Sequence, residues 1–209
     1  MGQRLLASFL LMAALVAGCG SSNHKAAAPP PTRTTTTVAS PGTTTAAAGP
    51  GALEAEANAA AAGDIPDNQV FIVFRNPAGG YSMKYPEGWA QQGSAGRVDF
   101  RDKNNIVRVV VTSGGAASAA SVRAQVARLR GATIRSAAQT LSVSGRPAVK
   151  VVYSTRSAPN AVTGKRVNLV VDRYYLWNGG RRAVVDLGTP EGVDNVDAYR
   201  LMIESFRWH

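Results

Sequence analysis

The stretch of sequence that decides the fold is Asn76-Pro77-Ala78-Gly79-Gly80-Tyr81-Ser82-Met83-Lys84-Tyr85-Pro86-Glu87-Gly88-Trp89. Its centre, Tyr81 to Tyr85, alternates large apolar side chains with small or charged ones. A period of two places alternate side chains on opposite faces and is typical of a half-buried β-strand. Pro86 ends this run, because proline has no N–H to give to the ladder of a central strand. The stretch therefore predicts a short strand that is followed by a turn.

The same period of two recurs along most of the chain after residue 70. In one of the runs Val107, Val109 and Val111 share a face. β-branched and aromatic residues, which are enriched in strands, dominate these runs. The predicted strands are residues 70–74, 81–85, 97–101, 106–112, 148–155, 167–177 and 183–187.

A hairpin is predicted where Asn178-Gly179-Gly180 separates the last two of these strands. If Gly179-Gly180 forms the loop, Arg173 faces Asp186 across the hairpin. If Asn178-Gly179 forms it, Val171 faces Asp186 instead. A cross-strand pair of opposite charges is stabilising, and it slightly favours the first register.

Two segments have the pattern of amphipathic helices. The first is capped by Ser118 or Ser121 and runs to Arg130, with Gly131 ending it. The second runs from about residue 194 to 205, and its expected buried stripe is Val196, Tyr199, Ile203 and Phe206. Strands and helices without regular βαβ alternation predict an α+β fold, a central antiparallel sheet flanked by helices.

The quoted stretch is similar to the start of PsbP-like domains, in which a strand carrying Gly-Tyr/Phe-Ser is followed by Tyr-Pro-x-Gly-Trp. Phe100 fits the next strand of that family, and residues 199–207 look like its terminal helix ending in Ser-Phe. The resemblance implies a PsbP-like α/β/α sandwich over residues 70–209, as in actinobacterial lipoproteins of the LpqN type. Members of this family share a fold and a habit of binding other macromolecules, and they do not share a chemistry.

The N-terminus has the pattern of a targeting segment. Arg4 precedes an apolar run from Leu5 to Val16, which is too short to span a membrane and fits a secretory signal peptide. The following Val16-Ala17-Gly18-Cys19 resembles the lipobox of bacterial lipoproteins. That resemblance implies a signal peptide over residues 1–18 and a diacylglycerol on the Cys19 thiol. The alternative is an ordinary signal cleavage site beside a stray thiol.

Residues 19–69 form the predicted tether between this cysteine and the domain. They are rich in alanine, threonine and proline and have no hydrophobic period, so they cannot bury enough apolar surface to offset the entropy of ordering. A transient helix is compatible with the alanine-rich stretch 53–62.

The amino-acid composition limits the kinds of functional site that the chain can form. One cysteine excludes a disulfide framework, a cysteine-based zinc site and an iron–sulfur cluster, and His24 and His209 lie near the two ends. No motif of a hydrolase, kinase or metalloprotease occurs, so we expect no enzyme, no metal and no cofactor. The net charge is +10, and residues 64–209 hold 20 Lys or Arg against 11 Asp or Glu.

An aromatic and basic cluster on the predicted hairpin is the candidate binding site: Tyr175, Trp177, Arg181 and Arg182. Rings can stack on a sugar, and guanidinium groups can hold an anion. The alternative is ordinary cross-strand packing with arginines stacked on exposed rings.

We expect a non-catalytic binding or accessory module on the extracytoplasmic face of the cell membrane, held there by its lipid anchor. Its basic surface favours an anionic envelope polymer, lipid headgroups or an envelope protein as partner, and secretion argues against nucleic acid. One alternative is an envelope glycan hydrolase that uses paired carboxylates such as Asp172 and Asp186. Another is a carrier of an apolar ligand between sheet and helix.

Overall fold

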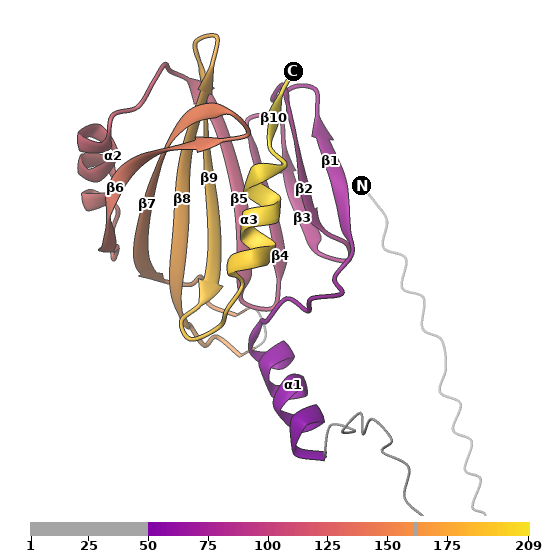
Figure 1. Ribbon diagram of the computed structural model, residues 1–209. Helices are drawn as coiled ribbons and strands as arrows, with labels where there is room; N and C mark the ends of the chain where they lie inside the picture. Colours follow the sequence, from indigo (N-terminus) through magenta and orange to yellow (C-terminus); the bar gives the residue numbers. More distant parts are fainter. Residues whose placement is uncertain (1–49, 161–162) are drawn as a thin grey trace, which may run out of the picture. The chain divides into compact units, whose positions relative to one another are not determined.

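The computed structural model describes residues 50–160 and 163–209 (Figure 1), so the signal peptide, Cys19 and most of the predicted tether lie outside the described residues. The described part consists of antiparallel strands and three short helices. In chain order the elements are α1 (Pro50–Ala62), β1 (Phe71–Asn76), β2 (Tyr81–Pro86), β3 (Ala90–Ser94), β4 (Arg97–Asp102), β5 (Asn105–Ser113), α2 (Ala119–Ala127), β6 (Thr133–Val143), β7 (Arg146–Arg156), β8 (Asn168–Asn178), β9 (Arg181–Pro190), α3 (Val196–Glu204) and β10 (Arg207–Trp208).

Seven of the strands form one antiparallel sheet in the order β3-β4-β5-β9-β8-β7-β6. The hairpin β8–β9 has the register in which Asn178 faces Arg181, so Gly179-Gly180 is its loop. Both loop glycines have positive φ, which is the backbone geometry that such a tight turn requires. Arg173 consequently faces Asp186, and the register that the charge pair favoured is confirmed.

The quoted stretch builds the second sheet, whose order is β1-β2-β10. Its strands β1 and β2 pair from Phe71 opposite Pro86 to Asn76 opposite Tyr81. Gly80, in the turn between them, has φ +65°, and a Cβ there would collide with the guanidinium of Arg181. Glycine at this position therefore lets the tip of the large hairpin lie against the small sheet.

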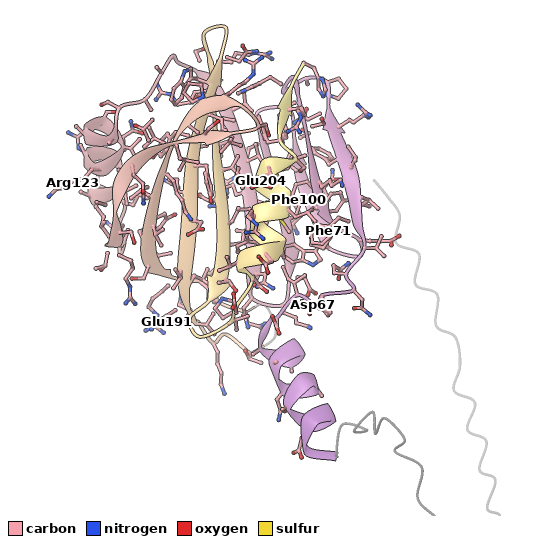
Figure 2. All side chains as sticks on the ribbon, viewed as in Figure 1. Asp67, Phe71, Phe100, Arg123, Glu191 and Glu204 are labelled. Carbon is pink, nitrogen blue, oxygen red and sulfur yellow. The ribbon has the colours of Figure 1, made fainter. Side chains whose placement is uncertain are left out.

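The core lies on both faces of the seven-stranded sheet. On one face Val98, Phe100 and Val107 pack in a cluster with the small sheet and with Met202 of α3. Figure 1 shows α3 in front of this sheet, and Figure 2 labels Phe71 and Phe100 in this layer. On the other face α2 lies over β6 and β7, and its Val122 is fully buried. The period of two in β5 and β7 thus separates two hydrophobic clusters.

Helix α2 is shorter than its sequence pattern predicts. Ser118 caps it, with a reciprocal pair of hydrogen bonds between Ser118 and Ser121, each 3.1 Å. The last helical residue is Ala127 rather than Arg130, because Arg128 and Leu129 turn in tighter geometry, with N–H bonds to Gln125 and Val126.

Helix α3 buries a stripe that differs by one position from the predicted one. Tyr199, Ile203 and the following Phe206 are buried as expected, but Val196 is 68% exposed. Val196 lies in the first turn, outside the contact with the sheet, and Met202 is buried in the core in its place.

His209 was expected to lie far from any core. Its ring Nε2 lies 2.8 Å from the Ser82 hydroxyl oxygen.

Packing with the domain begins before residue 70, the predicted boundary. Ile65 is buried, and its N–H donates to Asn195 Oδ1 at 2.8 Å. The carbonyl of Gly63 accepts from the amides of Asn105 and Asn195 at 2.5 and 3.1 Å. We call Gly63, Asn105, Asn195 and Tyr199 the polar node, since the Tyr199 hydroxyl also lies 3.5 Å from Asn105 Oδ1.

Helix α1 precedes the polar node and lies within the stretch that the sequence assigned to the tether. None of the helices in the described ranges has both the length and the apolar character that crossing a membrane requires.

The predicted fold class is correct in its α+β character and in its antiparallel sheet. The molecule is richer in sheet than a helix-flanked sandwich, because the three-stranded sheet shares one outer layer with α3. The sequence pattern did not predict β3, β6 or β10. The five residues of β3 are all exposed and the eleven of β6 are mostly exposed, so neither strand shows a clear period of two, and β10 has only two residues.

The polar node yields a testable prediction. Asn195→Ala removes the acceptor of the buried Ile65 N–H, while the Gly63 carbonyl keeps its bond from Asn105, and leaving one buried polar group unsatisfied costs about 1–3 kcal/mol. We expect a loss of unfolding free energy of about 1–3 kcal/mol in urea denaturation. Asn68→Ala is the control, because Asn68 is exposed. Equal stability of the two variants would show that the node contributes nothing.

Candidate functional site

A row of alternating charges crosses the face of the large sheet that α2 partly covers. Asp99 of β4 lies directly opposite Arg108 of β5, which lies opposite Asp186 of β9, which lies opposite Arg173 of β8. Directly opposite residues in antiparallel strands project on the same face, so the four side chains form one continuous line. We call this line the charge row.

The first half of the charge row is centred on Asp99. Arg108 binds its carboxylate with two bonds, Nε to Oδ1 at 2.8 Å and Nη2 to Oδ2 at 3.2 Å. Arg101 and Arg97, on the same strand, reach Oδ2 at 3.1 and 3.5 Å. Burial alone would raise the pKa of Asp99, but the hydrogen bonds and charges of these arginines outweigh it, so the pKa lies below its usual value.

The second half is a closed ion pair between Arg173 and Asp186. Nε and Nη2 of Arg173 bind the two carboxylate oxygens at 2.6 and 2.7 Å, and the side chains are only 14% and 7% exposed. The Arg173 guanidinium also lies 5.2 Å from the centre of the Tyr153 ring. Burial, with the Asp186 charge, raises the pKa of Tyr153 to about 12.

The charge row separates two different parts of the sheet face. On one side the next positions in register are apolar, Val110, Val184 and Tyr175, and they continue into the cluster beneath α2. On the other side lies a pocket of about 400 Å³, which we call the sheet pocket. Its floor includes Ile106 and Val171, and its walls are the turn 103–105 and the segment 155–160.

The sheet pocket is lined mainly by positive charge. Arg101, Lys103, Arg108 and Arg156 line it, and Asp186 is its one acidic lining residue among those the structure describes. That carboxylate is held by Arg173, so it cannot neutralise the others. Asp99 is shared among three guanidinium groups. The pocket therefore carries a surplus of positive charge.

Two titratable side chains, Tyr153 in the sheet pocket and Asp99 beside it, have pKa values shifted away from neutral pH. Proton transfer is efficient when the pKa of the group lies near the working pH. The pKa of Asp99 is lowered and that of Tyr153 is raised, so both move away from neutrality. In residues 50–160 and 163–209 there is no group of three or more His, Cys, Asp or Glu arranged to hold a metal ion.

Of the four residues predicted from the hairpin, Tyr175, Trp177 and Arg182 lie on one face of the sheet and Arg181 lies on the other. Tyr175 is 1% exposed and belongs to the cluster under α2. Trp177 and Arg182 face each other across the hairpin, and Arg182 donates to the carbonyl of Gly115 at 3.0 Å. Arg181 contacts the small sheet, with its guanidinium 5.1 Å from the centre of the Trp208 ring. Cys19, the predicted lipid attachment site, lies outside the described residues.

The carboxylates of the hydrolase alternative lie on opposite faces of the sheet. Asp186 belongs to the charge row, whereas Asp172 faces Leu187 and binds Lys150 Nζ at 2.6 Å. Two acids separated by a sheet cannot flank one glycosidic bond. Where an apolar ligand was expected, between sheet and helix, Met202 and Ile203 of α3 pack in one cluster with Leu187.

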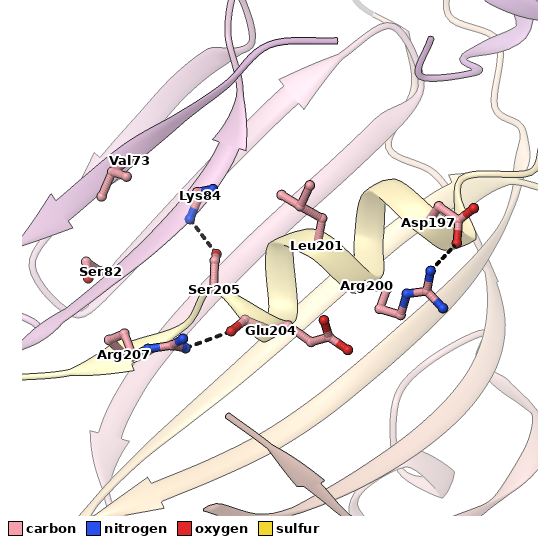
Figure 3. A pocket seen from close by; sticks show the side chains of 9 residues that line it. All are labelled: Val73, Ser82, Lys84, Asp197, Arg200, Leu201, Glu204, Ser205 and Arg207. Atoms are coloured by element: carbon pink, nitrogen blue, oxygen red, sulfur yellow. Dashed lines mark hydrogen bonds and ion pairs between the residues drawn. The ribbon is translucent and has the colours of Figure 1, made fainter. Parts of the chain in front are cut away.

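A second hollow, of about 760 Å³, lies between β1–β2 and α3 (Figure 3). Its charges are exposed and mutually compensated: Arg200 binds Asp197 at 2.8 Å with side chains 64% and 86% exposed. Its polar contacts include bonds to backbone groups, such as Ser205 Oγ accepting from the Lys84 N–H at 2.7 Å. Exposed ion pairs contribute little to stability and do not fix the positions of their side chains. The sheet pocket is therefore the stronger candidate.

The sequence contains a signal for the sheet pocket that an analysis of strand periodicity alone overlooks: charged residues within the strands. Asp99, Arg108, Arg173 and Asp186 each lie next to at least one large apolar residue of the same strand. A charge on the buried side of a strand needs a partner at the same level of the neighbouring strand. Only the Arg173–Asp186 pair was found, because a hairpin sets its own register and the other pairings join strands that are distant in sequence.

Comparisons with known proteins support the fold. No family model and no curated protein matches the sequence. Among solved structures the chain is similar to that of the PsbP protein CyanoP from the cyanobacterium Synechocystis sp. PCC 6803. The sequences are 18% identical, the TM-score is 0.50, and the match covers 70% of this chain and 98% of that one.

Two further structures align less well. One is from Bacteroides thetaiotaomicron VPI-5482, at 14% identity and a TM-score of 0.44 over 66% of this chain and 48% of that one. The other is the Ran-binding protein Mog1p of Saccharomyces cerevisiae, at 8% identity and a TM-score of 0.44 over 68% and 96%. The described domain therefore has a PsbP-like fold, and at these identities the likeness concerns the fold alone.

The buried pair of the charge row can be tested by mutation. Asp186→Leu leaves the Arg173 charge buried without a partner, which costs about 3–5 kcal/mol. The double variant Asp186→Leu/Arg173→Met removes both charges and should recover most of the loss in urea denaturation. Asp197→Leu, which breaks the exposed pair with Arg200, is the control and should change stability far less.

Tyr153 gives a prediction for alkaline pH. Its pKa of about 12 in the folded protein exceeds the value of about 10 for an unfolded chain. The stability that this group contributes is therefore complete below pH 10 and is lost as the pH rises from 10 to 12. Urea denaturation between pH 8 and 12 should show a shallower decline for Tyr153→Phe than for the wild type. Parallel declines would contradict the assignment.

Proposed function

We propose that the chain is a membrane-anchored extracytoplasmic lipoprotein whose PsbP-like domain is a non-catalytic binding or accessory module. The anchor is argued from the sequence, where the single cysteine of the chain occupies the lipobox position after an apolar run of signal-peptide length. A diacylated cysteine carries two acyl chains, which is the number that stable anchoring takes.

The observation that carries the binding role is the charge row with the adjoining sheet pocket. Both carboxylates of that row are committed to arginines, and Arg97 and Arg101, which also bind Asp99, add two further positive charges. Fixed, half-buried cations attract and orient an anionic group without needing a change of protonation. This arrangement favours binding over catalysis.

The partners we propose are anionic components of the cell envelope: a polymer, lipid headgroups or an acidic protein. Residues 64–209 carry nine more basic than acidic side chains, and such a surface is drawn to anionic partners in a salt-dependent manner. We place the domain on the extracytoplasmic face, because a lipoprotein signal directs the chain across the membrane before the thiol is acylated.

The anchor is tested by replacing its cysteine. Cys19→Ala should move the protein from the membrane fraction into the soluble fraction of the envelope, because one thiol carries the attachment. The measurement is immunoblotting of fractions after a high-salt wash, which removes proteins held by charge alone. Ser21→Ala keeps the cysteine and should remain with the membranes. Retention of Cys19→Ala there would refute the anchor.

The binding role is tested by crosslinking in intact cells, followed by solubilisation and affinity purification of the full chain. We expect a specific partner or polymer whose recovery falls as the salt concentration of the wash rises. The matched comparison is Lys103→Gln/Arg156→Gln, which removes two cations from the sheet pocket, against Arg123→Gln/Arg128→Gln, which removes two from α2. Recovery of no partner by any of these proteins at low salt would contradict the binding role.

A further inference from the structure

We propose that the sheet pocket binds a phosphate group that carries a short apolar body. Arg108, Lys103 and Arg156 hold the phosphate, and the apolar body lies on Ile106. This inference names the ligand class of the binding role proposed above, and it rests on that role and not on the lipid anchor. Each step of the argument uses a different feature of the pocket.

The number of charges favours a phosphate over a single carboxylate. Along the charge row four guanidinium groups, those of Arg97, Arg101, Arg108 and Arg173, face the two carboxylates of Asp99 and Asp186. Two positive charges therefore remain, and the cationic side chains of Lys103 and Arg156 also line the pocket. A phosphate monoester carries up to two negative charges near neutral pH, which matches this surplus better than one carboxylate does.

The geometry leaves a directed donor at the pocket. Arg108 uses Nε and Nη2 on Asp99, and in the described part of the chain no group accepts a hydrogen bond from its Nη1. The Arg108 side chain is 28% exposed and lines the pocket, so this nitrogen is available to a ligand there. Because Asp99 already binds Nε and Nη2, the Arg108 side chain is ordered before a ligand arrives. Binding of the ligand therefore costs little further side-chain entropy.

The strand register explains why the floor of the sheet pocket is apolar. Ile106 of β5 and Val171 of β8 lie on either side of Gly188 of β9. A Cβ at Gly188 would approach the Ile106 side chain to 2.9 Å, so glycine is what allows the two side chains to close over the middle strand. They form a continuous apolar patch beside the cations, where an apolar group can be buried.

The size of the pocket sets the size of the ligand. A hollow of about 400 Å³ lies in the range of small-molecule sites and exceeds what a bare phosphate would fill. Ile106 and residues of the segment 155–160 line this hollow together with the cations. The ligand class is therefore an organic phosphate with a body about the size of one ring or a short chain.

The test is calorimetric titration of the full chain in micelles of a non-ionic detergent at low salt. The probes are phenyl phosphate, inorganic phosphate and monomeric dihexanoyl phosphatidylglycerol. The control is dihexanoyl phosphatidylcholine, a zwitterion without net charge. We expect phenyl phosphate to bind once per chain, more tightly than inorganic phosphate, and to weaken as salt is added. Failure of all three anionic probes to bind would overturn the inference.

Two kinds of variant separate a pocket from a general attraction of anions. Lys103→Gln/Arg156→Gln should weaken phenyl phosphate binding about tenfold or more, since two charge-assisted contacts are lost. Arg123→Gln/Arg128→Gln lowers the net charge equally on exposed residues of α2, where Figure 2 shows Arg123 pointing outward, and should bind as the wild type does. Equal weakening in both double variants would overturn the inference.

Thr155→Trp tests the volume of the pocket without changing its charge. Thr155 is half-buried and lines the pocket, so an indole there should exclude the phenyl group and abolish the advantage of phenyl phosphate over inorganic phosphate. Circular dichroism checks that this variant folds, and the two glutamine variants decide the question if it does not. Unchanged phenyl phosphate binding by folded Thr155→Trp would place the phosphate elsewhere.

The probes also distinguish the source of the phosphate. Binding of phosphatidylglycerol but not of phenyl phosphate supports a lipid headgroup, and the reverse supports a soluble phosphate monoester. The experiments distinguish failure of this ligand assignment from failure of the proposed binding function. A chain that binds none of the phosphates but still recovers an envelope partner in the crosslinking experiment keeps its binding role, and only the ligand class falls.

Discussion

The cost of burying charge is the constraint around which the large sheet is organised. A guanidinium removed from water must find a carboxylate at the same level of an adjacent strand, and Asp99, Arg108, Asp186 and Arg173 meet this requirement across four strands. A shift of one residue between two of these strands would separate their paired charges, and in one direction it would place Asp186 opposite Asp172. The charge row therefore favours one register, and it also marks where the apolar cluster under α2 ends and the sheet pocket begins.

Small residues at two points connect this sheet to its surroundings. Gly80 allows the Arg181 guanidinium to reach the small sheet, where it lies against Trp208 and donates to the carbonyl of His209 at 3.0 Å. Gly188 allows Ile106 and Val171 to approach each other over β9, and its carbonyl accepts from the Tyr199 hydroxyl at 2.7 Å. The second glycine thus links the floor of the pocket on one face with α3 on the other.

Sequence reasoning predicted the local structure better than the site. Alternation in residues 106–112 and the loop Gly179-Gly180 predicted faces and a hairpin that the structure confirms, because both depend on neighbours in the chain. The hairpin pattern did not show how its residues are distributed, since Tyr175 is buried in the cluster that includes Val122 of α2 and Arg181 lies on the opposite face. The sheet pocket depends on the pairing of β5 with β9, residues about eighty apart in sequence, and no local pattern encodes that distance.

The polar node has a mechanical consequence. The chain enters the domain at Gly63 and Ile65, whose backbone groups are held by Asn105 and Asn195. Any tension drawn along the N-terminal segment reaches these hydrogen bonds before it reaches a strand of the large sheet. The bonds join the first residue of β5 to the residue that precedes α3, so the load divides between a sheet and a helix. A pull on the N-terminal segment would strain the polar node first, and Asn105, which also lines the sheet pocket, would carry part of that strain to the pocket.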